Sequence, residues 1–189
     1  RASAGSGIER LTNPRDWARP HRGFQVRPVK EAYWRVPAAA GVESDIVDFA
    51  TWMQAMMGSR PDVLPAPALQ LAHRPRVGTG RLYGGPLRQA TSDASYGLGW
   101  RSFTYGGRRL EGHSGAVEGY RATMIFDPAT RTGVVAMWNS DWGFPFRIPF
   151  AAIDSYHQRE DTNWLDLGEL PPVTRARTAA KAIVEPPKG

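Results

Sequence analysis

The sequence predicts an α+β fold in which helices flank an antiparallel sheet. Between residues 96 and 138, segments of β-favouring residues follow one another through short connections. Before and after them, residues 44–57 and 147–166 show the hydrophobic spacing of three and four residues that is typical of amphipathic helices. Helices segregated from a run of strands favour an α+β protein over an alternating α/β one.

The N-terminal part is predicted to be irregular to about residue 30 and helical further on. Six helix breakers interrupt this first segment: Gly5, Gly7, Pro14, Pro20, Gly23 and Pro28. Ser44 is the expected N-cap of a helix that runs to about Met57 and ends before Gly58. A second short helix is expected over residues 67–73. Residues 76–94, which contain four glycines, are expected to form a loop or an excursion from the fold.

Four antiparallel strands are predicted to follow, and Gly106-Gly107 marks a two-residue hairpin turn between the first two. The predicted strands are residues 96–105, 108–113, 119–126 and 133–138. The last of them is apolar on both faces, so it should lie centrally in the sheet or be covered on both sides. The helix over residues 147–166 is expected to cover the sheet, and residues 169–189 to form a C-terminal tail.

Composition excludes several classes of function. The chain has 189 residues, enough for one domain, and no cysteine, so disulfides, thiolate metal sites and cysteine nucleophiles are excluded. Its net charge is +6, but the arginines are scattered and form no basic stripe, which argues against nucleic-acid binding. No apolar run approaches the roughly 20 residues of a membrane span. The four histidines lie far apart without metal-ligand spacing and no phosphate loop is present, so no cofactor or metal is indicated.

A polar group between glycines, Gly112-His113-Ser114-Gly115-Ala116, is the candidate site. One interpretation is a nucleophile elbow around Ser114, because the group differs from G-x-S-x-G only at Ala116. An elbow needs a buried strand before the serine and a helix after it, whereas both flanks here favour other structure. A second interpretation is an ordinary edge-strand pair, His113 and Ser114, beside glycines that bend the chain. A third is an active-site strand, in which the glycines allow close approach of a substrate to the backbone.

The third interpretation is supported by a resemblance to a known protein family. His113-Ser114-Gly115 stands where serine penicillin-recognising enzymes carry K-T-G, between a hairpin and two further antiparallel strands. This part of the chain resembles the β-lactamase and penicillin-binding-protein superfamily, above all class C β-lactamases and their esterase and D-aminopeptidase relatives, some of which use His for Lys. The likeness covers about residues 14–165, through Trp17-Ala18-Arg19-Pro20-His21, residues 36–42 followed by Ser44, Asp48 and Trp52, Tyr96-Gly97-Leu98-Gly99-Trp100, and Gly119-Tyr120.

The resemblance implies acyl transfer: a serine attacks an ester, amide or β-lactam carbonyl, and water resolves the acyl-enzyme. His113 would take the place of the lysine and hydrogen-bond around the general base. Ser114 would contact the substrate, and Gly115 would let the substrate lie flat along the strand. The N–H of Ala116 would donate to the oxyanion. Because histidine is only partly charged near pH 7, an esterase or peptidase-like relative is favoured over a dedicated β-lactamase.

The family's nucleophile motif, S-x-x-K, is absent from the sequence, since no lysine has a serine three residues before it. The Tyr-x-Asn or Ser-x-Asn motif is absent too. The resemblance places both upstream of every matched residue. Residues 1–168 are therefore expected to be the C-terminal part of a β-lactamase-like, DD-peptidase-like domain whose N-terminal part is missing. The expected partners are that N-terminal half, which carries the serine, and a small-molecule or peptide substrate.

Two alternative functions stay open beside the half-enzyme. One is a penicillin-binding-like module that recognises peptides without turnover, and the other is an α/β-hydrolase with Ser114 as nucleophile. The resemblance implies a periplasmic or secreted location, although nothing in the residues themselves argues against a cytoplasmic one.

Overall fold

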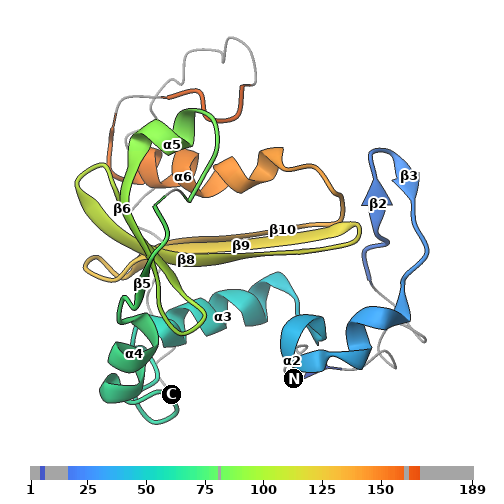
Figure 1. Ribbon diagram of the computed structural model, residues 1–189, viewed down its shortest axis with the longest axis horizontal. Coiled ribbons are helices and arrows are strands. Elements are labelled where there is room, and N and C mark those ends of the chain that lie inside the picture. Colours follow the sequence, from blue (N-terminus) through green and yellow to red (C-terminus); the bar gives the residue numbers. More distant parts are fainter. Residues whose placement is uncertain (1–4, 7–16, 81, 160–161, 167–189) are drawn as a thin grey trace, which may run out of the picture.

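A six-stranded antiparallel sheet organises the computed structural model, which describes residues 5–6, 17–80, 82–159 and 162–166 (Figure 1). Neighbouring strands follow the order β10-β9-β8-β7-β6-β5, so each strand pairs with the next one along the chain. The strands are β5 (Val77–Gly78), β6 (Thr91–Tyr96), β7 (Arg101–Tyr105), β8 (Arg108–Val117), β9 (Tyr120–Asp127) and β10 (Thr132–Trp138). The predicted α+β class with an antiparallel sheet is confirmed.

Helices cover the sheet on both faces. Helix α3 (Ile46–Met56) lies on one face, and α6 (Ile148–Tyr156) lies on the other together with α5 (Pro86–Ala90) (Figure 1). Side chains alternate between the faces along each strand, so the core has two parts. The part toward α3 is built on Met53, Met56, Trp100, Met124 and Phe126. The part toward α6 is built on residues that include Phe103, Tyr105, Leu110, Ile125 and Phe150.

Glycines and an aspartate shape the hairpin turns, and the one at Gly106-Gly107 follows the predicted chemistry. Gly106 and Gly107 both have positive φ, 57° and 75°, which a two-residue turn between twisted strands requires. The β8–β9 turn uses Gly119, whose φ is 75°. Asp127 shapes the β9–β10 turn by accepting a hydrogen bond from the N–H of Ala129 at 2.8 Å.

The predicted helix over residues 44–57 is present, but its N-cap is Asp45 and the expectation for Ser44 was wrong. The Asp45 side chain accepts hydrogen bonds from the N–H groups of Val47 and Asp48, at 2.9 and 2.8 Å. Aspartate is as good an N-cap as serine, and its charge also suits the positive end of the helix. The second helix, α4, spans Ala66–His73, close to the prediction.

Residues 76–94 are not the predicted loop, because β5, α5 and the first residues of β6 lie there. Strand β6 was missed since its sequence, TSDASY, is polar on both faces and only Ala94 is buried. Its pairing with β7, including an irregularity between Ser92 and Ser95, is a tertiary contact that the local pattern does not encode.

The apolar strand β10 is covered as predicted, with α3 and α6 packed against it. It is not central: within the described residues it pairs with β9 alone and lies at the edge of the sheet. Helix α6 ends at Tyr156, well before the predicted Asp166. Gln158 has a positive φ of 52°, and the chain turns back so that the Trp164 indole donates to the Asp154 carboxylate at 2.7 Å.

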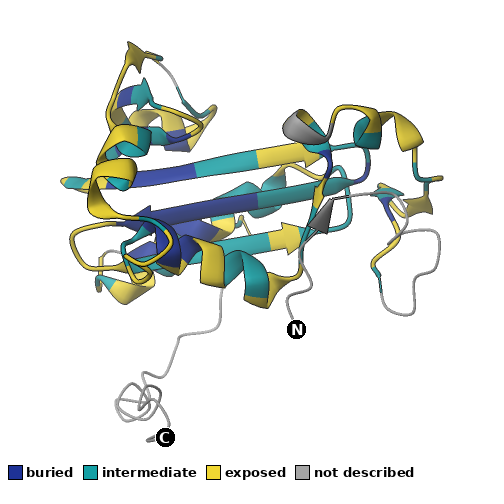
Figure 2. Ribbon diagram, turned by 90° about the horizontal axis from the view of Figure 1, so that it is seen from below, coloured by how far each residue is buried: buried dark blue, intermediate teal, exposed yellow. Residues whose placement is uncertain are grey.

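The N-terminal segment packs around one end of the sheet. It contains the small antiparallel pairs β2 (His21–Arg22) with β3 (Gln25–Val26) and β1 (Gly5–Ser6) with β4 (Val42–Glu43). The 3-10 helix η1 (Glu31–Arg35) and α2 (Pro37–Ala40) lie between them, and a further 3-10 helix, η2 (Phe144–Arg147), precedes α6. Strand β8 is buried over residues 110–112 and becomes exposed at Gly115 and Ala116, and Figure 2 shows such changes of burial along the strands. The predicted tail, residues 169–189, lies outside the described residues.

Candidate active site

Strand β8 carries the candidate residues and divides into two halves by its pairing. With β9 it pairs over its length, from Glu111 opposite Phe126 to Val117 opposite Tyr120. With β7 it pairs only from Arg108 to Gly112, which lies opposite Arg101, the first residue of β7. Residues 113–117 therefore extend beyond β7 and have an open edge on that side. We call residues 108–112 the closed half of β8 and residues 113–117 the open half.

The register determines which main-chain groups face the open edge. Opposed residues in an antiparallel ladder alternate between exchanging both hydrogen bonds and exchanging none. The two-residue turn makes Val117 and Tyr120 a bonded pair, so Gly115 and His113 also bond toward β9. Ser114 and Ala116 then direct their N–H and C=O groups to the other side. No strand of the described chain pairs with them there.

His113 lies on the face of the sheet that α3 covers, opposite Met124. Its Nε2 is 2.9 Å from the hydroxyl oxygen of Tyr96, the last residue of β6, and the two rings meet edge to face with centroids 5.9 Å apart. The guanidinium of Arg101 lies over the Tyr96 ring, 5.3 Å from its centroid. Burial, and after it the positive charge of Arg101, holds the pKa of His113 below its usual value.

Ser114 faces the opposite side of the sheet. Its hydroxyl is 2.9 Å from that of Thr123, the residue opposite it on β9, and Thr123 is buried. Consecutive residues of a strand point to opposite faces, so the side chains of His113 and Ser114 are not brought together. Ser114 also sits mid-strand before a hairpin rather than at a strand-to-helix turn. The nucleophile-elbow hypothesis is therefore wrong on geometry.

The two glycines of the motif differ in their surroundings. A Cβ on Gly112 would collide with the carbonyl oxygen of Met124 and lie 3.1 Å from the Ile125 Cα. A Cβ on Gly115 would meet nothing within 4 Å. Gly112 is thus required by packing between β8 and β9, whereas Gly115 and Ala116 are exposed on the open half.

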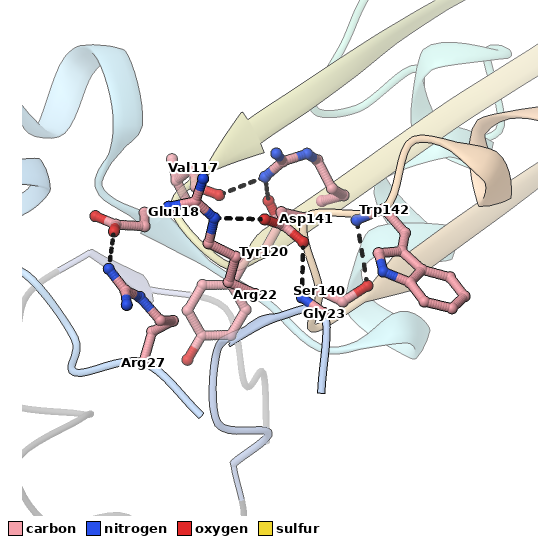
Figure 3. Close-up of polar contacts among 10 residues, drawn as sticks. Arg22, Gly23, Arg27, Val117, Glu118, Tyr120, Ser140, Asp141 and Trp142 are labelled. Carbon is pink, nitrogen blue, oxygen red and sulfur yellow. Dashed lines mark hydrogen bonds and ion pairs between the residues drawn. The ribbon is translucent and has the colours of Figure 1, made fainter. Parts of the chain in front are cut away.

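The tip of the β8–β9 hairpin is fixed by the N-terminal segment (Figure 3). Glu118 accepts a hydrogen bond from Lys30 Nζ at 2.6 Å and lies 3.5 Å from Arg27 Nη2. Hydrogen bonding to Lys30 lowers the pKa of Glu118. In the loop after β10, the Asp141 carboxylate accepts from the N–H of Gly23 at 3.1 Å, which ties the N-terminal segment to that loop as well. These contacts hold the far end of the open half in place.

Two side chains beside His113 were not predicted as site residues from the sequence: Tyr96 and Arg101. Tyr96 belongs to the Tyr-Gly-Leu-Gly-Trp segment, which was recognised only as part of the resemblance. Its contact with His113 joins residues 17 positions apart across β7, and no local pattern signals such a contact. Within the described residues, no group of three His, Asp or Glu side chains is arranged to hold a metal.

Comparison with models of protein families shows which family the chain belongs to. The family model described as Beta-lactamase matches residues 3–157. The chain belongs to the Beta-lactamase family. This confirms the resemblance drawn from the motif and its flanks.

Three relatives of this Beta-lactamase family chain are distant from it in sequence. The unguisins hydrolase ungD of Aspergillus violaceofuscus is 29% identical over 126 residues, which are 60% of this chain and 22% of that protein. The octameric penicillin-binding protein homologue from Pyrococcus abyssi has a TM-score of 0.67 at 18% identity, over 86% of this chain and 36% of that one. A D-stereospecific amidohydrolase from a Streptomyces species reaches a TM-score of 0.43 at 22% identity, over 58% of this chain and 29% of that one.

The chain thus spans about a fifth of the curated relative and about a third of the solved structures. In the described part of the chain, no helix has the length and apolar character needed to cross a membrane.

Proposed function

We propose that this chain forms one wall of the acyl-transfer site of a serine hydrolase. The observation that carries the proposal is the open half of β8. There, in a Beta-lactamase family member, the main-chain groups of Ser114 and Ala116 face away from β9 beside His113. Donors that are already oriented and need no rearrangement are what stabilises the oxyanion of acyl transfer. The hydrolase among its relatives supports the same reaction class.

In this proposal, each site residue acts from its place on β8. Ala116 donates its N–H to the carbonyl oxygen of an ester, amide or β-lactam as negative charge develops there. His113 hydrogen-bonds around the general base from the α3 face. Gly115 leaves room for the substrate along the strand. Because the Ser114 hydroxyl is engaged by Thr123, Ser114 contacts the substrate through its main chain.

The nucleophile is proposed to come from a segment outside these 189 residues that carries S-x-x-K. That serine attacks the carbonyl, and the bond from the carbonyl carbon to the ester oxygen or amide nitrogen breaks as the acyl-enzyme forms. The freed oxygen or nitrogen takes up a proton, and it leaves unless, as in a β-lactam, it stays tethered. Water then releases the acid. The outer edge of β10 is a docking position for the N-terminal half. It has no partner in the described chain, and unpaired strand edges pair readily with other strands. A groove of about 170 Å³ beside it is lined by Thr132, Gly133, Val134, Ala152, Ile153 and Tyr156. We assign this edge and groove to the part of the N-terminal half that anchors it to the sheet, whereas the serine itself has to lie at the open edge of β8, on the far side of β9.

Covalent labelling tests the proposal. Residues 1–189 would be treated with a fluorophosphonate and with a fluorescent penicillin, alone and together with the proposed segment, and the labelled serine mapped by mass spectrometry. Label is expected on the partner's S-x-x-K serine, only when both parts are present and only in folded protein. Label on Ser114 in the chain alone would overturn the proposal.

The same experiment separates the peptide-recognition alternative. Saturable displacement of the penicillin by peptides, with no covalent adduct on either part, would indicate a binding module. A heat-denatured sample serves as the control for non-specific acylation. A periplasmic or secreted location belongs to the proposal by family resemblance, and fractionation of producing cells would test it.

A further inference from the structure

The contact between Tyr96 and His113 combines two rigidly held rings. Tyr96 closes β6, has its ring under the guanidinium of Arg101, and meets the imidazole edge to face. His113 is on β8, whose pairing with β9 fixes its backbone. The 2.9 Å separation between the Tyr96 oxygen and Nε2 is therefore set by the sheet rather than by a free side chain.

Burial, and after it the charge of Arg101, lowers the pKa of His113 and so favours the neutral form of the imidazole in this contact. Glu111 lies two residues earlier on the same face and would favour a charged His113. Its Oε2 atom lies beside Nδ1 of His73 from α4, whose own pKa is lowered by burial. A neutral imidazole has one N–H donor and one acceptor nitrogen, and its partners decide which nitrogen is which.

Within the described residues, one arrangement gives the Tyr96 hydroxyl proton an acceptor. If Nε2 carried the proton and donated to the Tyr96 oxygen, the tyrosine O–H would need another acceptor. Within the described residues the Tyr96 hydroxyl has no hydrogen-bond partner except His113. If Tyr96 donates, its proton and the lone pair of Nε2 are both used, and the imidazole proton resides on Nδ1.

We propose that Tyr96 is a positioning residue that donates its hydroxyl proton to Nε2 of His113 and so keeps the imidazole proton on Nδ1. The inference rests on the proposed function, in which His113 replaces a lysine. A lysine ammonium can only donate hydrogen bonds, whereas a neutral histidine can donate or accept at either nitrogen. Fixing the tautomer makes His113 a dependable donor at Nδ1 without a positive charge.

The test is the tautomer itself, read by ¹⁵N NMR of histidine-labelled complete protein at a pH where His113 is neutral. A His113→Asn variant assigns the signals. In the wild type, Nε2 is expected at the shift of an acceptor nitrogen and Nδ1 at that of a protonated one. In Tyr96→Phe, which keeps the ring, the two shifts should move toward each other or exchange.

Tyr120→Phe is the matched control. It also removes one tyrosine hydroxyl, which donates to the carbonyl of Ala18 at 2.9 Å, far from the imidazole. The His113 tautomer should not change in this variant, and the backbone amide spectra of both variants report whether the fold is kept. A proton on Nε2 in the wild type, or a tautomer that Tyr96→Phe leaves unchanged, would overturn the inference.

Kinetics of the complete enzyme give a second reading. Tyr96→Phe should lower kcat about tenfold with little change in KM, since one hydrogen bond that orients a catalytic donor is lost. If no acyl-enzyme forms with any substrate, the proposed function fails, but the tautomer measurement still decides the role of Tyr96. If the wild type has the Nδ1–H tautomer but Tyr96→Phe leaves kcat unchanged, the tautomer assignment stands and only its role in catalysis is overturned.

Discussion

The closed and open halves of β8 belong to one strand of one sheet, yet they differ in almost every property. In the closed half, Leu110 is fully buried and Gly112 has no room for a side chain. In the open half, Gly115 and Ala116 are exposed and a Cβ on Gly115 meets nothing. What changes between them is the neighbour: β7 is present beside the first half and absent beside the second.

The missing neighbour explains how a rigid strand edge is left available to a ligand. An unpaired edge elsewhere in a protein is mobile or prone to aggregation. Here the closed half anchors the strand on both sides, β9 continues to hold the open half, and Glu118 ties its tip to Lys30. Main-chain donors at the open edge are therefore oriented before any substrate arrives, which is the requirement for electrostatic stabilisation.

The largest expected effect comes from exchanging the two glycines for alanine. Gly112→Ala should lower the free energy of unfolding by about 3 kcal/mol, because the new methyl group collides with the backbone of β9. Gly115→Ala should change it by less than about 0.5 kcal/mol. Urea unfolding of both variants in parallel measures the difference. Equal losses would mean that the two halves are equally packed, and the comparison would fail.

A branched side chain at Gly115 tests whether the open half receives the substrate. Gly115→Val should lower kcat/KM of the complete enzyme about tenfold, because its methyl groups would occupy the space proposed for the substrate. The melting temperature should stay close to that of the wild type. Full activity in this variant would show that the substrate does not lie along this edge.

Replacing Ser114 tests whether its side chain has a structural role or binds the substrate. Ser114→Ala should lower the free energy of unfolding by about 1 kcal/mol, since the buried Thr123 hydroxyl loses its partner. Its effect on kcat/KM should be smaller than that of Gly115→Val, because the main-chain groups remain. The opposite result, normal stability with a large loss of kcat/KM, would restore the substrate contact to the Ser114 hydroxyl.

The smallest effect is a pH dependence contributed by His113. Its pKa is lowered in the folded state, so the unfolded chain binds a proton at higher pH than the folded one. Stability from this group is complete above the unfolded value of about 6.5 and is lost as pH falls from there through the folded pKa. Subtracting the stability profile of His113→Gln from that of the wild type isolates the contribution. A difference that grows as pH rises above 7 would contradict the sign.

Much of the fold was predictable because its signals are local. The Gly106-Gly107 turn and the helical spacing over residues 44–57 each specify their element within a few residues. The polar strand β6 and the early end of α6 at Tyr156 were missed for the opposite reason. Strand β6 is defined by its pairing with β7. The end of α6 accompanies the hydrogen bond from Trp164 back to Asp154. Both are contacts between residues that are not neighbours in the sequence.

The same division holds for the candidate site. The local sequence predicted a strand over residues 108–113 after a hairpin, and the order and flanks of Gly112-His113-Ser114-Gly115-Ala116 were enough to predict the family. In the structure this strand continues to Val117. The start of β7 opposite Gly112 is visible only in the folded chain, and with it the main-chain groups that are open and the contact between Tyr96 and His113. The physical reason is that strand identity depends on local residue preference, whereas register and strand ends depend on what the neighbouring strands pack against.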